Sequence, residues 1–357
     1  METGALNIGA VEVAVRAVGV ALPSYRVSQE EALDFFLTHY SLREGTRELF
    51  RRVFRGGSIR ERRFALQTPE ELLHEDLDQT HHRFQKSATD LASRALTEAL
   101  AKAGASPRDL DFLAVTTCTG SLCPGLSSYV AETVGLRPDV RRADLVGMGC
   151  GAALPAMEAA SDFLRASGKG LAAVVSSEIC SAAILVDDAA DLVISNALFA
   201  DGAAAAILGT GSSPGCPRIV RFTSLHYPAW REGLRFRLQG GRLRNVLSKE
   251  VPARSAQALQ ELLPPLLGPS GLGQGDVAHW ILHAGGDKIL DAAETSLHLP
   301  ATALTAARRV LRDFGNMSSP TVLFVLKEIL ASSPVPGPGV LASFGAGFSA
   351  HGALLEF

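Results

Sequence analysis

The chain lacks three features that would assign it to a specialised class of protein. It lacks a strong net charge, because 34 Lys and Arg stand against 37 Asp and Glu, and this argues against binding to nucleic acid through a basic field. It lacks an apolar run near the ~20 residues that a membrane span requires. Residues 1–23 alternate like a strand and include acidic residues, unlike a secretory signal. We therefore expect a cytoplasmic protein with no membrane span and no nucleic-acid partner.

Cysteine is scarce and is not paired in sequence. The number of cysteines is odd, and no CxxC pair is present, so the spacing favours neither a disulfide framework nor a zinc site. The cysteines are Cys118, Cys123, Cys150, Cys180 and Cys216. We expect free thiols in a reducing compartment and no bound metal.

What the chain has in abundance is apolar sequence arranged as alternating strands and helices. Of its 357 residues 47% are hydrophobic, enough for two halves that each bury a core. The runs "LDFLAVTTC", "GLAAVVSSEIC" and "AAAAILG" are typical of strands covered on both faces. The segment "SATDLASRALTEALAKAG" predicts a helix with Ser87 as its N-cap, and residues 28–86 predict one or two helices, then a Gly-Gly break. This alternation indicates an α/β architecture.

The second half repeats the pattern of the first. "HWILHAGG" matches "LDFLAVTTCTG", and "DFGNMSSPTVLFVLKEILASS" matches "GMGCGAALPAMEAASDFLRAS". The separation of Cys118 from His283 and that of Cys150 from Asn316 differ by a single residue. In a third match, "FADGAAAAILG" with "FGAGFSAHGALLEF", the two motifs are separated by fewer residues, so the later part of the repeat is shorter. We infer a diverged duplication with halves at 1–212 and 213–357, separated by the Gly/Ser/Pro-rich stretch 209–217.

The duplication predicts that Cys150 and Asn316 lie at equivalent helix starts that face each other, with His283 at a matching strand end. Glycines flank Cys150, and the first turn of a helix favours a thiolate. A histidine can hold such a thiolate, and His and Asn can both donate hydrogen bonds to a developing oxyanion. The structural alternatives are an inert core cysteine, a core histidine and an asparagine that caps a helix. A Cys–His–Asn protease fits the residue types but not the duplicated layout.

Five ordered motifs give the chain a resemblance to a known family. "GMGCGAA", "NALFADGAAAAILG", "ILHAGGDKIL", "FGNMSSPTVLFVL" and "SFGAGFSAHGALLEF" resemble the motif set of the type III polyketide synthases, the chalcone-synthase-like members of the thiolase superfamily. The resemblance runs from about residue 10 to the C-terminus. It implies a five-layer αβαβα thiolase-like fold with two pseudo-duplicated halves.

The resemblance implies an acyltransferase that needs no metal or redox cofactor. Cys150 would be loaded with a starter acyl group from coenzyme A, and His283 would keep it as thiolate. His283 and Asn316 would bind the thioester carbonyl of malonyl-CoA and stabilise the enolate left by decarboxylation. That carbanion would attack the acyl thioester, repeatedly, and release a pyrone, resorcinol or related cyclised polyketide. Phe199 falls at the family's gatekeeping aromatic, although packing alone would also explain it.

The resemblance also suggests how coenzyme A and the starter are bound. Arg52 and Arg55 are candidates for the CoA phosphates, unless they belong to a solvated helix face, and Gly285 and Gly286 would let the backbone approach the pantetheine arm. The remaining cavity positions are less polar than in plant members and resemble bacterial enzymes that use fatty acyl starters. They are Cys118, Cys180, Ala183 and Leu243. Aromatic starters, or malonyl-CoA alone giving tetrahydroxynaphthalene, stay open.

The chain departs from the family at two places. Cys123 stands where a family member extends a methionine into its neighbour's cavity, which leaves that contact of the implied homodimer in doubt. "SFGAGF" lacks the proline of the family's corresponding segment, which puts the rigidity of that wall in doubt. The alternatives are a β-ketoacyl synthase of the KAS III type, which performs one condensation with an acyl-carrier-protein substrate, and a non-catalytic partner subunit.

Overall fold

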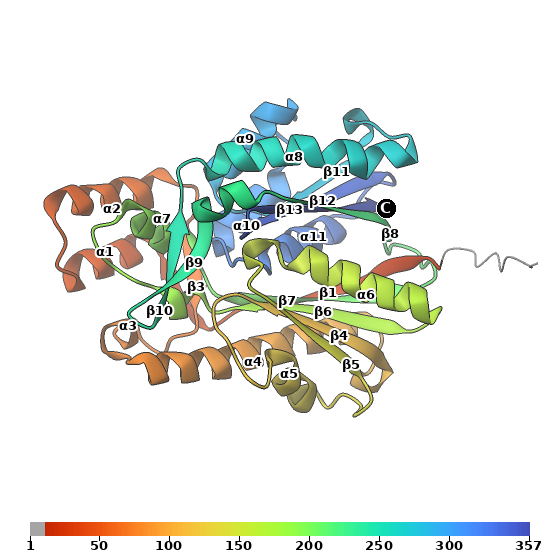
Figure 1. The fold of residues 1–357 in the computed structure, drawn as a ribbon, viewed down its shortest axis with the longest axis horizontal. Coiled ribbons are helices and arrows are strands. Elements are labelled where there is room, and N and C mark those ends of the chain that lie inside the picture. Colours follow the sequence, from red (N-terminus) through yellow and green to blue (C-terminus); the bar gives the residue numbers. More distant parts are fainter. Residues whose placement is uncertain (1–10) are drawn as a thin grey trace, which may run out of the picture.

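Residues 11–357 are described in a computed structural model, in which helices and strands alternate in five layers (Figure 1). The helices are α1 Gln29–His39, α2 Glu44–Gly56, α3 Glu71–His74, α4 Leu77–Lys102, α5 Leu126–Val134, α6 Ala153–Ser167, α7 Ala190–Leu198, α8 Val251–Leu267, α9 Asp287–Leu297, α10 Thr305–Phe314 and α11 Thr321–Ala331. The strands are β1 Val13–Ala21, β2 Tyr25–Ser28, β3 Glu61–Phe64, β4 Leu110–Thr117, β5 Arg141–Val146, β6 Leu171–Glu178, β7 Gly202–Thr210, β8 Arg218–His226, β9 Leu234–Gln239, β10 Arg242–Leu247, β11 His279–Leu282, β12 Pro338–Gly345 and β13 Ser349–Glu356.

The predicted duplication is visible in the sheet. Within the described part of the chain the main sheet has nine strands in the order β11-β12-β13-β8-β1-β7-β6-β4-β5. The run β11-β12-β13-β8 has the same sequence of parallel and antiparallel pairings as the run β4-β6-β7-β1. The two runs are joined only where Val13 and Ala14 of β1 pair with Ile219 and Arg218 of β8. The thiolase-like fold is therefore present, with two halves that share one strand order.

The match between the halves also shows why the repeat is shorter in its later part. In the first half α7 lies between β6 and β7, whereas in the second half a short turn joins β12 to β13. Strand β5, which pairs with the outer side of β4, also has no counterpart beside β11 among the described residues. The predicted division at 212/213 falls in the connection between β7, which ends at Thr210, and β8, which begins at Arg218. As a domain boundary it stays a prediction.

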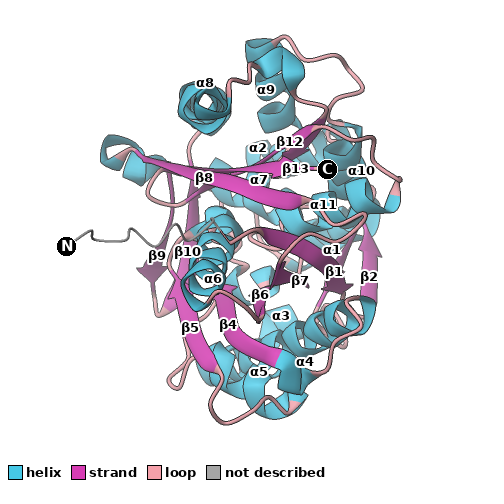
Figure 2. Ribbon diagram, turned by 90° about the vertical axis from the view of Figure 1, so that its right-hand side faces the viewer, coloured by secondary structure: helices cyan, strands magenta, loops and turns pink. Residues whose placement is uncertain are grey.

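Two buried helices lie between the halves and bring their functional ends together. Helices α6 and α11 pack between the two halves of the main sheet. Helices α4 and α5 cover the outer face of one half, and α8 and α9 cover the outer face of the other (Figures 1 and 2). Buried side chains of α6, such as Leu154 and Met157, share one apolar core with Leu323 and Leu326 of α11. Because α6 and α11 are the equivalent helices of the duplication, their N-terminal ends are the predicted places of Cys150 and Asn316.

The sequence predicts most of these elements but not every boundary. The strands at 110–117, 171–178 and 202–210 are confirmed, and two helices precede the Gly-Gly break as expected. The predicted N-cap at Ser87 is wrong, because the N-cap of α4 is Asp76, eleven residues earlier, which accepts a hydrogen bond from the amide of Gln79. Of the predicted N-terminal strand, residues 1–10 lie outside the described part. None of the helices described in residues 11–357 is long and apolar enough to cross a membrane.

Candidate active site

Cys150 lies in a short 3-10 turn, Gly149–Gly151, directly before α6. Gly149 has a φ of 62°, a left-handed conformation that side chains rarely adopt, and an added Cβ would lie 3.0 Å from the amide nitrogen of Ala346. That same amide donates to the carbonyl of Met148 at 3.1 Å. The glycine thus allows the cysteine turn of one half to pack against the β12–β13 turn of the other. The expected position of Cys150 at a helix start is confirmed.

Asn316 lies between α10 and α11 with both ends of its carboxamide engaged. Its Nδ2 donates to the carbonyl of Gly285 at 3.1 Å, and its Oδ1 accepts from the amide of Ser318 at 2.8 Å. Its backbone bonds to Leu198 and Ala200, on either side of Phe199. Asn316 therefore does not cap α11, which begins at Thr321. One Nδ2 hydrogen remains for a ligand.

His283 follows β11 and is 2% exposed. Its amide donates to the carbonyl of Ala342 at 2.8 Å, which fixes the backbone against β12. Its Nδ1 has no hydrogen-bond partner within residues 11–357, and burial lowers the pKa of the imidazole to about 4. Gly285 lies against the ring, since an added Cβ there would be 3.4 Å from Nε2. The imidazole is therefore neutral at ordinary pH.

The three residues are connected through Gly285 and Ser318. Asn316 is bonded to Gly285, which lies against His283, and to Ser318, which lines one cavity together with Cys150. Burial raises the pKa of Cys150 to about 12, and the negative charge of Glu178 adds to this, while Ser318 acts in the opposite sense. The helix start was expected to favour a thiolate, but burial outweighs it. The site thus holds a neutral thiol and a neutral imidazole.

A buried carboxylate near Cys150, that of Glu178, was not predicted from the sequence. Glu178, the last residue of β6, is fully buried and accepts hydrogen bonds from the amides of Cys118 and Thr119 at 2.9 and 3.1 Å and from the Ser319 hydroxyl at 2.8 Å. Burial still raises the pKa of its carboxyl group. Ser318 also lies near it, with a φ of 62° that is uncommon outside glycine. A carboxylate that ends an apolar strand, as in "VVSSE", is the signal that could have identified it.

An apolar cavity of about 50 Å³ reaches Cys150. Four of the predicted cavity residues line it, namely Cys118, Cys180, Ala183 and Phe199. Further lining residues not identified from the sequence are Phe64, Ile184, Leu234, Phe236 and Asn245. His283 and Asn316 are buried and do not line this cavity.

Two of the predicted cavity residues lie elsewhere. Leu243 is on β10 opposite Leu238 and does not line the cavity, whereas Asn245, two residues further along the same face, does. Cys123 is exposed in the loop before α5, next to Pro124, and does not line it either. Cys123 therefore does not contribute to the Cys150 cavity of its own chain.

The candidate CoA residues come from two elements that touch. Arg52 and Arg55 lie on α2, and Arg55 makes an exposed ion pair with Glu30 at 2.9 Å. Just past α2, the amide and hydroxyl of Ser58 donate to the carboxylate of Asp287 at 2.8 and 2.6 Å. Asp287 opens α9 and follows Gly285 and Gly286. The arginine helix and the glycine turn thus meet beside His283.

Arg62, in the same arginine-rich run, is 1% exposed and so does not face solvent. It donates to the carbonyls of Asn196 and Phe199 at 2.6 and 2.8 Å, and to the side chain of Gln29. Burial lowers the pKa of its guanidinium to about 9. Arg62 therefore supports the backbone of the cavity-lining Phe199.

Comparisons with known proteins agree over nearly the whole chain. Residues 20–215 match the family described as FAE1/type III polyketide synthase-like protein, and residues 227–356 match chalcone and stilbene synthases, C-terminal domain. A 3,5-dihydroxyphenylacetyl-CoA synthase of Amycolatopsis balhimycina is 33% identical, with 95% of this chain and 92% of that protein covered. A 1,3,6,8-tetrahydroxynaphthalene synthase of Streptomyces peucetius is 32% identical, with coverages of 96% and 93%.

Two further similarities concern a more distant relative and a solved structure. An alpha-pyrone synthesis polyketide synthase-like protein of Mycobacterium tuberculosis is 28% identical, with 96% of this chain and 90% of that protein covered. The crystal structure of a polyketide synthase from the brown alga Ectocarpus siliculosus superposes with a TM-score of 0.91 at 27% identity, with coverages of 97% and 98%.

Proposed function

The chain belongs to the type III polyketide synthases, acyltransferases that perform decarboxylative condensation, and we propose that Cys150 carries the acyl group in that reaction. The observation that supports this assignment is the set of contacts that links His283, Gly285, Asn316 and Ser318, together with the apolar cavity that Ser318 and Cys150 both line. The substrates we propose are an acyl-CoA and malonyl-CoA, used in the cytoplasm.

In the loading step, His283 acts as the base for Cys150. Because both groups are neutral, the imidazole accepts the thiol proton as the sulfur attacks the acyl-CoA carbonyl. The proton then passes to the departing CoA thiolate, so that free CoA leaves and the acyl group stays on sulfur. His283 returns to its neutral form, ready for the next step.

In the extension step, His283 and Asn316 bind the thioester carbonyl of malonyl-CoA. Loss of carbon dioxide leaves an electron pair that spreads onto this oxygen, and the free Nδ2 hydrogen of Asn316 and an imidazole N–H donate to it. The fixed carboxamide of Asn316 costs no reorganisation at this stage, because Gly285 and Ser318 already orient it. The carbanion attacks the acyl carbonyl and expels the Cys150 thiolate, which is reloaded for the next extension.

For the starter, we infer a fatty acyl group that enters an apolar site. Cys118, Cys180, Ala183 and Ile184 present little polarity to it. However, about 50 Å³ is below the ~300–1,000 Å³ of ordinary ligand sites. Phe64 and Ile184 also line a second, more open cavity of about 400 Å³ against α1, into which a longer chain would extend if these side chains moved apart.

A second candidate is malonyl-CoA as starter and extender. The small cavity next to Cys150 and the similarity to a 1,3,6,8-tetrahydroxynaphthalene synthase favour it. Incubating the protein with malonyl-CoA alone, and with a panel from acetyl-CoA to stearoyl-CoA, separates the candidates by mass spectrometry. If the starter is a fatty acyl group, pyrones or resorcinols should form whose masses increase with the length of the acyl-CoA added. A single product whose mass is the same for every acyl-CoA of the panel would favour malonyl-CoA alone.

The same reactions test the assignment against the other classes. A type III enzyme works on CoA thioesters without a carrier protein, so product formation in purified components supports the proposal. Strict dependence on an acyl carrier protein would instead favour the KAS III-like alternative. Absence of acyl transfer under both conditions would favour a non-catalytic subunit.

We also propose a homodimer, in which Cys123 lies near the neighbouring cavity. Strand β5 is the edge strand of its half, and Val146 at its end is 61% exposed, which leaves an edge able to pair with a second copy. Sedimentation should show a dimer that Val146→Glu weakens by about tenfold or more. Leu238→Glu is the matched control, since Leu238 is 74% exposed on the β9–β10 hairpin. A monomeric wild-type protein would exclude the dimer.

A further inference from the structure

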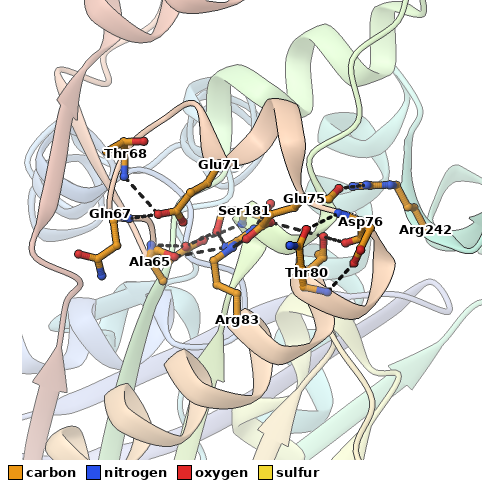
Figure 3. A network of polar contacts seen from close by, with 12 residues as sticks. Ala65, Gln67, Thr68, Glu71, Glu75, Asp76, Thr80, Arg83, Ser181 and Arg242 are labelled. Atoms are coloured by element: carbon orange, nitrogen blue, oxygen red, sulfur yellow. Dashed lines mark hydrogen bonds and ion pairs between the residues drawn. The ribbon is translucent and has the colours of Figure 1, made fainter.

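Arg83 and Glu75, which do not line the Cys150 cavity, form a largely buried ion pair within a network of polar contacts (Figure 3). Arg83 of α4 donates through Nε to Oε1 of Glu75 at 2.7 Å and through Nη2 to Oε2 at 2.9 Å. Their side chains are only 10% and 13% exposed. Two parallel charge-assisted hydrogen bonds hold the guanidinium plane in one orientation.

The remaining donors of Arg83 bind two separate segments. Nη1 donates to the hydroxyl of Ser181 at 2.7 Å and to the carbonyl of Ala65 at 3.3 Å. Both segments also bind Asp201, since the hydroxyl of Ser181 donates to its Oδ2 at 2.6 Å and the amide of Ala65 to the same oxygen at 2.7 Å. Arg83, Ser181, Ala65 and Asp201 thus form a cluster in which each residue is bound to at least two others.

The three segments of this cluster other than that of Arg83 each supply a wall residue of the cavity. Ala65 follows Phe64, Ser181 follows Cys180, and Asp201 lies two residues after Phe199. A fourth segment of the cavity wall, β10, is bound to Glu75, whose backbone carbonyl accepts a hydrogen bond from Nη2 of Arg242 at 2.7 Å (Figure 3). Arg242 begins β10, the strand that contributes Asn245. Four chain segments that are distant in sequence are therefore linked, directly or through one further residue, to Arg83 and Glu75.

We propose that Arg83, fixed by Glu75, is a positioning residue that sets the width of the Cys150 cavity and so the length of the polyketide. This inference rests on the proposed function, because only an enzyme that extends its product repeatedly turns cavity size into product length. With about 50 Å³ available, a small displacement of one wall changes the space by a large fraction. Arg83 does not line the cavity, and it acts through Phe64, Cys180 and Phe199.

The test compares variants that differ in what they remove. Arg83→Gln removes the charge that compensates Glu75. Arg83→Lys keeps a positive charge but cannot form the two parallel hydrogen bonds that the guanidinium makes with Glu75. Ser181→Ala keeps the ion pair and removes the hydroxyl that bridges Arg83 and Asp201. Arg94→Gln is the matched control on the same helix, because its ion pair with Asp90 is exposed. Ser181→Ala keeps the inference testable if Arg83→Gln does not fold.

The measurement is the ratio of the main polyketide to shorter and longer products, together with the melting temperature. Arg83→Gln and Ser181→Ala should change this ratio by about tenfold or more, because a misplacement of about 1 Å is enough for effects of that size. The product ratio of Arg83→Lys should lie between those of these two variants and that of the wild type, and the product ratio of Arg94→Gln should equal that of the wild type. A folded Ser181→Ala variant with the wild-type ratio would overturn the inference.

A second measurement separates this inference from the proposed function. Alkylating reagents with chains of increasing length react with Cys150 according to the room beside it, whether or not the enzyme condenses malonyl units. Peptide mass spectrometry gives the rate of alkylation of Cys150 for each length of the reagent's chain. Wild-type protein that forms no polyketide would contradict the proposed function, whereas an unchanged length dependence in Ser181→Ala would contradict the role of Arg83.

Discussion

At the scale of the residue, two opposing effects act on Cys150, and the structure shows which one is larger. The start of α6 favours a thiolate, and so does the Ser318 hydroxyl. Burial in an apolar cavity beside Glu178 opposes them and raises the pKa of the thiol to about 12. A neutral cysteine is protected from unspecific reactions, and in the proposed mechanism it becomes a nucleophile when His283 accepts its proton.

Replacement of Cys150 by alanine should abolish acyl loading and reduce product formation on the order of 10³-fold or more, since the nucleophile is removed. Intact-mass spectrometry after incubation with an acyl-CoA measures the loading, and product analysis measures the turnover. Cys216→Ala is the matched control, because Cys216 is a half-buried cysteine that does not line the cavity. Product formation by Cys150→Ala at the wild-type rate would exclude this residue as the acyl carrier.

The sequence was sufficient for some residues of the site and not for others. Cys150, His283 and Asn316 lie in motifs that the duplication places at equivalent ends, so their proximity could be predicted. Glu178 and Ser318 could not, because their importance comes from hydrogen bonds across three segments. Burial is also a property of the whole fold, and for this reason the thiolate that the helix start predicted for Cys150 was wrong.

At the scale of the element, the α6 start and the β12–β13 turn fit together without free space. Gly345→Ala should remove most activity, by about a hundredfold, and lower the melting temperature, because its Cβ would lie 2.3 Å from the Met148 carbonyl and 2.9 Å from the Gly151 amide. Kinetics and thermal unfolding measure both effects. Gly275→Ala is the control, as nothing lies within 4 Å of its Cβ. An active Gly345→Ala variant would show that the cysteine turn tolerates displacement.

Helix α2 should contribute to coenzyme A binding through its exposed basic face. Arg52→Ala should raise the KM for malonyl-CoA by about tenfold and leave kcat within about twofold, since a phosphate contact is equally strong in the ground and transition states. Arg51→Ala is the control, because Arg51 is paired with Glu44 and Glu48 on the same helix. Steady-state kinetics at two salt concentrations measure the effect. An equal KM for both variants would place the phosphates elsewhere.

Element boundaries were less predictable than element types. The apolar runs identify β4, β6 and β7, because a strand buried on both faces needs apolar residues throughout. The start of α4 was misplaced because its first turns carry polar residues and little apolar periodicity. Its true N-cap, Asp76, satisfies a capping box with Gln79 that the sequence analysis did not consider.

At the scale of the whole molecule, duplication explains why residues so far apart in sequence meet. Each half brings the ends of its central strands and the start of its buried helix to one place, and packing α6 against α11 brings the two places together (Figure 2). The order of elements could be predicted from the repeats. The junction through β1 and β8 could not, because it rests on two residue pairs at strand ends.

The buried histidines should make stability depend on pH over the whole molecule. Burial lowers the pKa of His283 and of His351 to about 4, below the ~6.5 of an unfolded histidine. Between these values the unfolded chain binds more protons than the native protein, so the free energy of unfolding falls as the pH decreases from about 6.5 to 4 and then levels off. Each histidine contributes a loss of about 3 kcal/mol by this argument.

Urea unfolding at several pH values, compared between wild type and His283→Gln, isolates one of these contributions from the carboxylates that titrate nearby. The variant should lose less stability than the wild type between pH 6.5 and 4, by about 3 kcal/mol, because glutamine binds no proton in either state. His81→Gln is the control, since His81 is exposed and should follow the wild-type curve. Parallel curves for wild type and His283→Gln would mean that the pKa of His283 is the same in the native and the unfolded protein, and would contradict the lowering of this pKa by burial.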